Sequence, residues 1–224
     1  MSSGEGAFEI EGLCRWVYET CGFDPQDPPL APDLVEALLG PGAIWPMTPS
    51  RLPVPARLTT WPVWHWPGAA GPRTREWYVQ VRKRLADAAY VWGLAHEVAE
   101  WLLKTIEHYR GPDIERQANT LAAMLLVPRA YVLAHGARCF DADLAQTFSV
   151  TRSCLALRWA EVTGESLAVV SPNGVHRRGP ENVWPEDDTA LRWLARYDDA
   201  AATSGVRRVR RVDLGEKRTA ILLA

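Results

Sequence analysis

The chain has 224 residues, of which 47% are hydrophobic and 23% charged, and its formal net charge at pH 7 is −2. This near-neutral balance gives no general attraction to nucleic acid or to an anionic membrane, so any such contact has to be local. No apolar run approaches the roughly 20 residues that span a bilayer, and the N-terminal residues do not follow the pattern of a secretion signal. We therefore expect a cytoplasmic protein with one good-sized domain, or one domain and a small appendage.

The N-terminal half alternates between helical and irregular segments. Helical spacing of apolar residues, followed by glycine, predicts helices over residues 8–21 and 31–40. The Pro- and Gly-rich stretch that follows favours short strands. We place these strands around Ile44, Leu52–Val54 and Leu58, and a further one over residues 77–85. A long helix is then predicted from residue 86 to about residue 106.

Two further helical regions follow. Residues 113–127 form the first, with Asp113 as its N-cap and Pro128 as its end. Residues 141–164 read as two helices that are hinged at Phe148-Ser149-Val150, which is a helix-turn-helix outline. The second of these helices offers few long polar side chains that could reach base edges, so direct nucleic-acid binding is not expected.

The character of the chain changes after residue 164. Short β-like runs surround one polar, helical segment, so we expect residues 165–224 to form a small α+β appendage. One of these runs contains Arg207, Arg208, Arg210 and Arg211. A solvated edge strand that resists pairing is the favoured interpretation, with nucleic-acid contact as the alternative.

A polar motif interrupts the long helix of residues 86–106. Its sequence, GLAHEVAEWLL (93–103), places His96 and Glu100 four residues apart. On a helix such residues project from one face about 6 Å apart, close enough to hold one ion. Glu97 stands where zinc peptidases with a His-Glu-x-x-His motif carry the base that activates water. A third ligand normally comes from a later helix, and Glu115 opens one, but Glu100 stands where a second histidine is expected.

These two motifs together resemble the ImmA/IrrE family of metallopeptidases, whose members show T-L-A-H-E-x-x-H and then E-x-x-A-N-x-F-A-A-x-L-L-M-P. The second motif is matched by Glu115, Ala118, Asn119, Ala122, Ala123, Leu125, Leu126 and Pro128. The resemblance covers residues 75–164 and implies a zincin-like peptidase fold, with His96 and Glu115 as metal ligands and Glu97 as general base. Glu100 holds the position of the second ligand and departs from the pattern of the family. The family includes proteins that cleave or remove helix-turn-helix repressors.

The glutamate at position 100 changes the chemistry that we expect. A carboxylate binds zinc at about 2.0–2.2 Å, so Glu100 is a competent ligand. It also lowers the net charge of the first ligand shell, which makes the ion less able to acidify water. We therefore expect slower hydrolysis than in a relative with two histidines, and better tolerance of manganese or iron in place of zinc.

Two alternatives stay open at this point. The protein could be metal-free, in which case Glu97, Glu100 and Glu115 would crowd together and at least one carboxyl would have a raised pKa. Another histidine could instead supply the missing ligand. The candidates for that role are His65, His108, His135 and His176.

The sequence thus predicts an α+β protein. Residues 1–164 form a zincin-like metallopeptidase domain, mostly helical with a small sheet, which includes the helix-turn-helix-like segment 141–164, and residues 165–224 form the appendage. The first hypothesis is a metallo-endopeptidase that acts on a protein partner such as a helix-turn-helix repressor. The second is a metal-free pseudopeptidase that binds and regulates such a partner without cleaving it.

Overall fold

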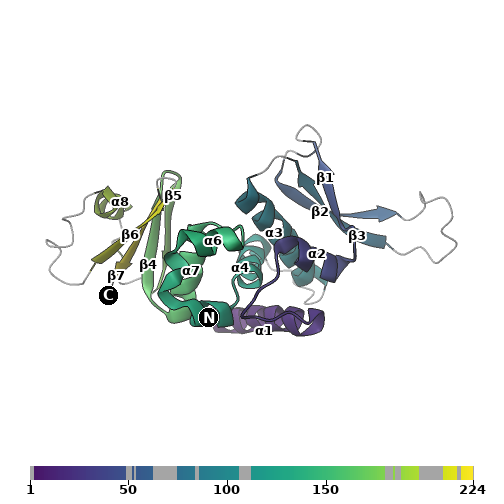
Figure 1. Ribbon diagram of the computed structural model, residues 1–224, viewed down its shortest axis with the longest axis horizontal. Coiled ribbons are helices and arrows are strands. Elements are labelled where there is room, and N and C mark those ends of the chain that lie inside the picture. Colours follow the sequence, from purple (N-terminus) through teal and green to yellow (C-terminus); the bar gives the residue numbers. More distant parts are fainter. Residues whose placement is uncertain are drawn as a thin grey trace. The chain divides into compact units, whose positions relative to one another are not determined.

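The computed structural model divides into two compact units, Met1–Pro128 and Arg129–Ala224, and it confirms a mixed α+β architecture (Figure 1). It describes residues 3–48, 52, 54–62, 75–83, 86–105, 112–179, 184, 188–196, 209–215 and 218–223. Across these residues, every helix is too short or too polar to cross a membrane.

Unit 1 combines four helices with a three-stranded sheet. The helices are α1 (Ser3–Cys21), α2 (Ala31–Leu39), α3 (Asp87–Thr105) and α4 (Ile114–Leu126). The strands are β1 (Ile44–Met47), β2 (Ala56–Pro62) and β3 (Arg75–Arg82). The strand order is β1-β3-β2, with β1 parallel and β2 antiparallel to the central β3. Within this sheet β2 is therefore an edge strand.

Helix α3 lies at the centre of unit 1 because its apolar face is buried against both the sheet and α4. Leu94, Val98 and Leu102 are fully buried on α3. The helix approaches β2 closely at Gly93, where an added Cβ would lie 3.1 Å from the Cβ of Ala56. A small residue at this position lets the polar face of α3 sit directly beside the edge strand.

Unit 2 is built around a four-stranded antiparallel sheet in the order β5-β4-β7-β6. Its strands are β4 (Ser166–Ser171), β5 (Gly174–Arg178), β6 (Val209–Gly215) and β7 (Arg218–Leu223). Its helices are α5 (Arg129–His135), the 3-10 helix η2 (Gly136–Phe140), α6 (Ala142–Thr147), α7 (Arg152–Thr163) and α8 (Asp188–Arg196). Helix α7 packs on one face of the sheet, and α8 with Trp184 packs on the other.

The positions of α6 and α7 agree with the two helices expected over residues 141–164. The Thr151 side chain caps α7 by accepting a hydrogen bond from the Cys154 amide at 3.1 Å, and Gly164 ends the helix at φ 76°. Helices α6 and α7 belong to the same compact unit as the C-terminal sheet. The physical reason is that Ala156 and Ala160 of α7 pack against Leu167 and Val169 of β4.

Other elements differ from expectation in detail. Helix α4 begins at Ile114 without a side-chain cap, because the Asp113 carboxylate instead accepts hydrogen bonds from the side chains of Arg116 and Gln117. Leu52 is buried but lies outside the strands. Helices α5 and η2 were not predicted. The arginine-rich segment forms the edge strand β6 from Val209 onward, and Arg207 and Arg208 lie outside the described residues.

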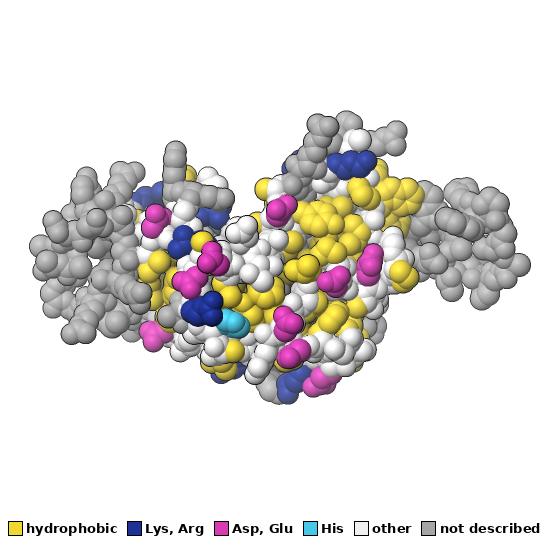
Figure 2. All heavy atoms as spheres, viewed as in Figure 1, with side chains coloured by type: hydrophobic (Ala, Val, Ile, Leu, Met, Phe, Trp, Pro, Cys, Tyr) yellow, Lys and Arg dark blue, Asp and Glu magenta, His cyan; other side chains and the backbone are white. Residues whose placement is uncertain are grey.

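Large apolar side chains are exposed near the sheet of unit 1. Trp45, Val54 and Trp77 are 47%, 38% and 37% exposed. Figure 2 shows hydrophobic side chains gathered over the sheet and the helices beside it, with acidic side chains among them. An apolar surface therefore borders the polar face of α3.

Candidate metal centre

Helices α3 and α4 bring together the three side chains that the sequence singled out. One ligand atom each of His96, Glu100 and Glu115 lies within 4.8 Å of the other two. The Nε2 atom of His96 is 3.4 Å from the Oε2 atom of Glu115. His96 and Glu100 lie one turn apart on α3, while Glu115 lies in the first turn of α4. The packing of the two helices thus creates a cluster that neither helix contains alone.

The donor set fits a divalent transition-metal ion. Metal–ligand bonds of about 2.0–2.2 Å place two ligand atoms roughly 3–4.4 Å apart, so small side-chain movements would suffice to close this cluster around an ion. The Glu115 side chain is 73% exposed and therefore has room to rotate. One imidazole nitrogen with two carboxylates is a ligand set that zinc, manganese and iron all accept.

Asn119 orients the histidine. Its Oδ1 atom lies 3.1 Å from Nδ1 of His96. With the amide oxygen as acceptor, Nδ1 carries the imidazole proton and the lone pair of Nε2 faces the Glu115 side. Asn119 matches the second sequence motif, but no role was predicted for it. Its spacing of four residues from Glu115 on α4 was the available signal, since such residues share one helix face.

Glu97 lies between the helix and the sheet. Its Oε2 atom accepts a hydrogen bond of 2.6 Å from the Leu58 amide on β2. Burial raises the pKa of Glu97, and Glu100 and Glu115 raise it further, while the Leu58 amide and His96 oppose the shift. The raised pKa expected for one of the crowded carboxyls is thus found at Glu97, with burial rather than crowding as its main cause. A carboxyl with a raised pKa is suited to exchange protons near neutral pH.

Lys104 is a further charged residue at the site, and it was not predicted from the sequence. It lies one turn beyond Glu100 on α3, and its ammonium group forms an ion pair with Oε1 of Glu100. The signal was present in the sequence, because Glu followed by Lys four residues later is a favoured pair on a helix.

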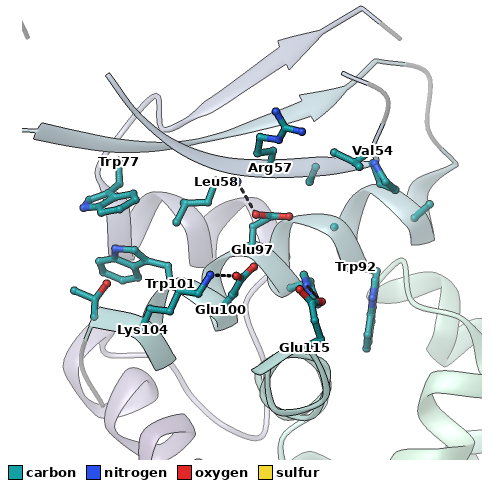
Figure 3. A pocket seen from close by; sticks show the side chains of 16 residues that line it. Val54, Arg57, Leu58, Trp77, Trp92, Glu97, Glu100, Trp101, Lys104 and Glu115 are labelled. Atoms are coloured by element: carbon teal, nitrogen blue, oxygen red, sulfur yellow. Dashed lines mark hydrogen bonds and ion pairs between the residues drawn. The ribbon is translucent and has the colours of Figure 1, made fainter. Parts of the chain in front are cut away.

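An open pocket of about 710 Å³ lies between β2, β3, α3 and the start of α4 (Figure 3). Its lining includes His96, Glu97, Glu100, Lys104 and Glu115. The edge strand β2 forms one wall, and Glu97 projects toward it from α3. Trp77 and Trp101 lie together at one end of the pocket, and Trp92 lies at the other. The pocket therefore combines a polar centre with aromatic ends, an arrangement that suits a peptide with apolar side chains.

Two of the other histidines considered as ligands, His135 and His176, belong to unit 2. His135 lies on α5 in unit 2, where its Nδ1 atom is 3.0 Å from the Tyr131 carbonyl oxygen and its ring stacks on Tyr131. His176 lies on β5 of the same unit. His65 and His108 lie outside the described residues.

Comparison with known proteins bears on the fold and the family. A solved structure described as a Mycobacterium tuberculosis transcriptional regulator matches with a TM-score of 0.52 and 16% identity, covering 96% of this chain and 75% of that chain. At this identity the likeness concerns the fold alone. No curated protein matches the chain. Residues 65–160 match the peptidase-family model described as the IrrE N-terminal-like domain. This stretch includes α3, α4 and the entire cluster, so the candidate site lies within the part of the chain that matches an IrrE N-terminal-like domain.

Proposed function

We propose that the protein is a metal-dependent endopeptidase that acts on a protein partner, with a helix-turn-helix transcriptional repressor as the expected class of substrate. The observation that carries the proposal is the convergence of His96, Glu100 and Glu115 beside Glu97 in an open pocket. A polar face on one helix is common, but a ligand set completed by a second helix is not expected from surface polarity alone. The family supports a regulatory role of this kind.

In this proposal His96, Glu100 and Glu115 hold a zinc, manganese or iron ion. Such an ion supplies Lewis acidity, which polarises a peptide carbonyl and makes water a better nucleophile. Glu97 accepts the proton of the attacking water and delivers it to the leaving amine. Burial in the pocket raises the pKa of Glu97, which favours that two-way transfer. The Leu58 amide holds the carboxylate in place during the exchange.

The edge strand β2 offers a place for an extended peptide. The Leu58 amide points toward Glu97, away from the Val79 partner of Leu58 on β3. Backbone groups two residues away along a strand point to the same side, so Ala56 and Thr60 present theirs at the same edge. A peptide that pairs with this edge would pass directly over Glu97, with the aromatic ends of the pocket available to its side chains.

A metal-free binding protein is the second candidate, and one observation favours it. Lys104 already supplies a positive charge to Glu100, which lowers the cost of gathering carboxylates at the site. In this case the pocket and the edge of β2 would hold the partner without cleaving it.

Elemental analysis and a cleavage assay on the purified full chain separate these candidates. We expect stoichiometric zinc, manganese or iron, and cleavage of casein or of a purified helix-turn-helix repressor. Glu97→Gln should retain the metal while cleavage falls by at least about 100-fold, because the proton acceptor is lost. Metal well below stoichiometry in every preparation, or full activity of Glu97→Gln, would exclude the peptidase mechanism.

A further inference from the structure

Lys104 is a charged residue of the pocket to which the proposed mechanism gives no role. Its ammonium group contacts Oε1 of Glu100, and the two side chains are 49% and 20% exposed (Figure 3). Arg57 on β2 also lines the pocket. Among the ion pairs of the described residues, Lys104 rather than Arg57 is the cation that contacts a carboxylate of α3.

The contact leaves Glu100 able to bind a metal ion. A carboxylate has two oxygens and about four acceptor positions, and Lys104 occupies Oε1. Acceptor positions on Glu100 therefore remain for an ion. Lysine and ion would then share one carboxylate, with the ammonium group on the outer side of the ligand.

This arrangement changes the charge of the ligand set. Glu100 alone would add a second negative charge to that of Glu115 and bring the shell around a divalent ion to neutrality. Glu100 and Lys104 together carry no net charge, as a neutral imidazole does. The set of His96, Glu115 and the Glu100–Lys104 pair therefore has the charge of two neutral donors and one carboxylate.

We propose that Lys104 is a positioning residue that neutralises Glu100, so that the Glu100–Lys104 pair replaces a neutral histidine at the second-ligand position. The inference rests on the metal site of the proposed function. It has a direct consequence for binding: the positive charge of Lys104 opposes a divalent ion, so the affinity of the site is lower with the lysine than without it.

The alternative is an ordinary helix-surface ion pair. Glutamate and lysine four residues apart stabilise a helix by about 0.3–0.5 kcal/mol, and such a pair has no effect on a neighbouring ligand. The two possibilities differ in metal affinity, which can be measured without any assay of activity.

The experiment measures the zinc and manganese affinity of the metal-stripped full chain by competition with a chromophoric chelator. Lys104→Gln should bind both ions about tenfold more tightly, because a unit charge a few ångströms from a divalent ion is removed from a largely solvated site. Lys104→Arg should stay close to the wild type, because the charge is kept. Arg57→Gln is the matched control: it removes one charge from the same pocket without touching Glu100, and should change affinity by less than about threefold.

A second variant pair tests whether the effect acts through Glu100. In a Glu100→Gln background, adding Lys104→Gln should change affinity by less than about threefold, because the carboxylate that holds the ammonium group beside the site is gone and the lysine extends into solvent. Unfolding temperatures of all variants check that folding is unaltered. Unchanged or weaker binding by Lys104→Gln overturns the inference and leaves the proposed metal site standing. Absence of metal binding in the wild type and in every variant overturns both.

Discussion

Helices α3 and α7 differ in where the partners of their charged side chains lie. On α7, Arg158 is only 5% exposed, and it pairs at 2.9 Å with Glu161, three residues further along the same helix. On α3, His96 contacts α4 through Glu115, and Glu97 contacts strand β2. Arg158 of α7 thus has its partner within its own helix, whereas His96 and Glu97 of α3 find partners on other elements. Glu100 of α3 combines the two cases, because it pairs with Lys104 of its own helix and also lies in the cluster with Glu115 of α4.

This difference indicates where chemistry is to be expected. A charged pair within one helix supports packing, and the face of α7 beside it is occupied by the sheet of unit 2. Charged groups that converge from several elements on an open pocket are held in place by the fold and stay accessible to a ligand. Burial is also the main cause of the raised pKa of Glu97, and it outweighs the opposing effects of the Leu58 amide and His96. From this contrast we expect ligand binding at α3 and α4, and a packing role for α7.

The largest expected effect comes from removing one fully buried leucine in each unit. Leu121→Ala on α4 and Leu155→Ala on α7 should each lower the free energy of unfolding by about 2–5 kcal/mol, because each leaves a cavity. Only Leu121→Ala should also weaken metal binding, since α4 carries Glu115 and Asn119. Chemical denaturation measures the first effect, and chelator competition under conditions in which both variants are folded measures the second. Equal losses of metal affinity in both variants would contradict the expectation that metal binding depends on unit 1 and not on unit 2.

A smaller effect distinguishes two histidines. His96→Ala removes the imidazole of the cluster and should weaken zinc binding by at least about 100-fold. The control is His135→Ala in unit 2, where the ring contacts Tyr131 of its own helix. This control should leave zinc affinity unchanged in the same competition assay. Retention of tight zinc binding by His96→Ala would remove the first ligand from the proposed set.

Two neighbouring residues on α4 give a finer comparison. Asn119→Ala removes the acceptor that orients His96 and should lower zinc affinity by about 10-fold. Thr120→Ala is matched to it, because the Thr120 hydroxyl donates at 3.0 Å to the Arg116 carbonyl of its own helix. Isothermal titration of both variants should show the loss for Asn119→Ala only. Similar affinities would mean that the histidine does not depend on its amide partner.

Much of this contrast could be predicted from the sequence, for identifiable reasons. Helix ends were marked by local signals such as Gly40, Thr151 and Gly164, which act within a few residues. The grouping of His96 with Glu100 follows from helical spacing. Adding Glu115 needed the second motif, and the structure brings all three together.

What the sequence did not predict depends on contacts between distant segments. The bond from the Leu58 amide to Glu97 joins residues 39 positions apart, and it exists because Gly93 lets α3 approach β2. The grouping of α7 with the C-terminal sheet arises because β4 and β7, from separate segments, form the surface on which it packs. Helical spacing alone could have paired Lys104 with Glu100. The pair becomes relevant to the site only because both residues line the pocket, which the sequence does not reveal.

The smallest expected effect is a dependence of stability on pH that originates at Glu97. The pKa of Glu97 is raised in the folded protein, so ionising this carboxyl lowers the free energy of unfolding. The destabilisation is absent below the unfolded pKa of about 4.3, grows as the pH rises above it, and is complete once the pH exceeds the pKa in the folded state. In metal-free protein, Glu97→Gln should therefore become more stable than the wild type as pH rises from 4 to 8, with the two nearly equal at about pH 4. Denaturation curves recorded with a chelator at several pH values measure this gap.

Because burial is the largest cause of the shift, added salt should reduce the gap only slightly. Parallel curves for the two proteins would mean that folding leaves the pKa of Glu97 unchanged. A gap abolished by salt would mean that charged neighbours rather than burial shift this pKa, and the difference between α3 and α7 would then reduce to the number of charges each helix carries.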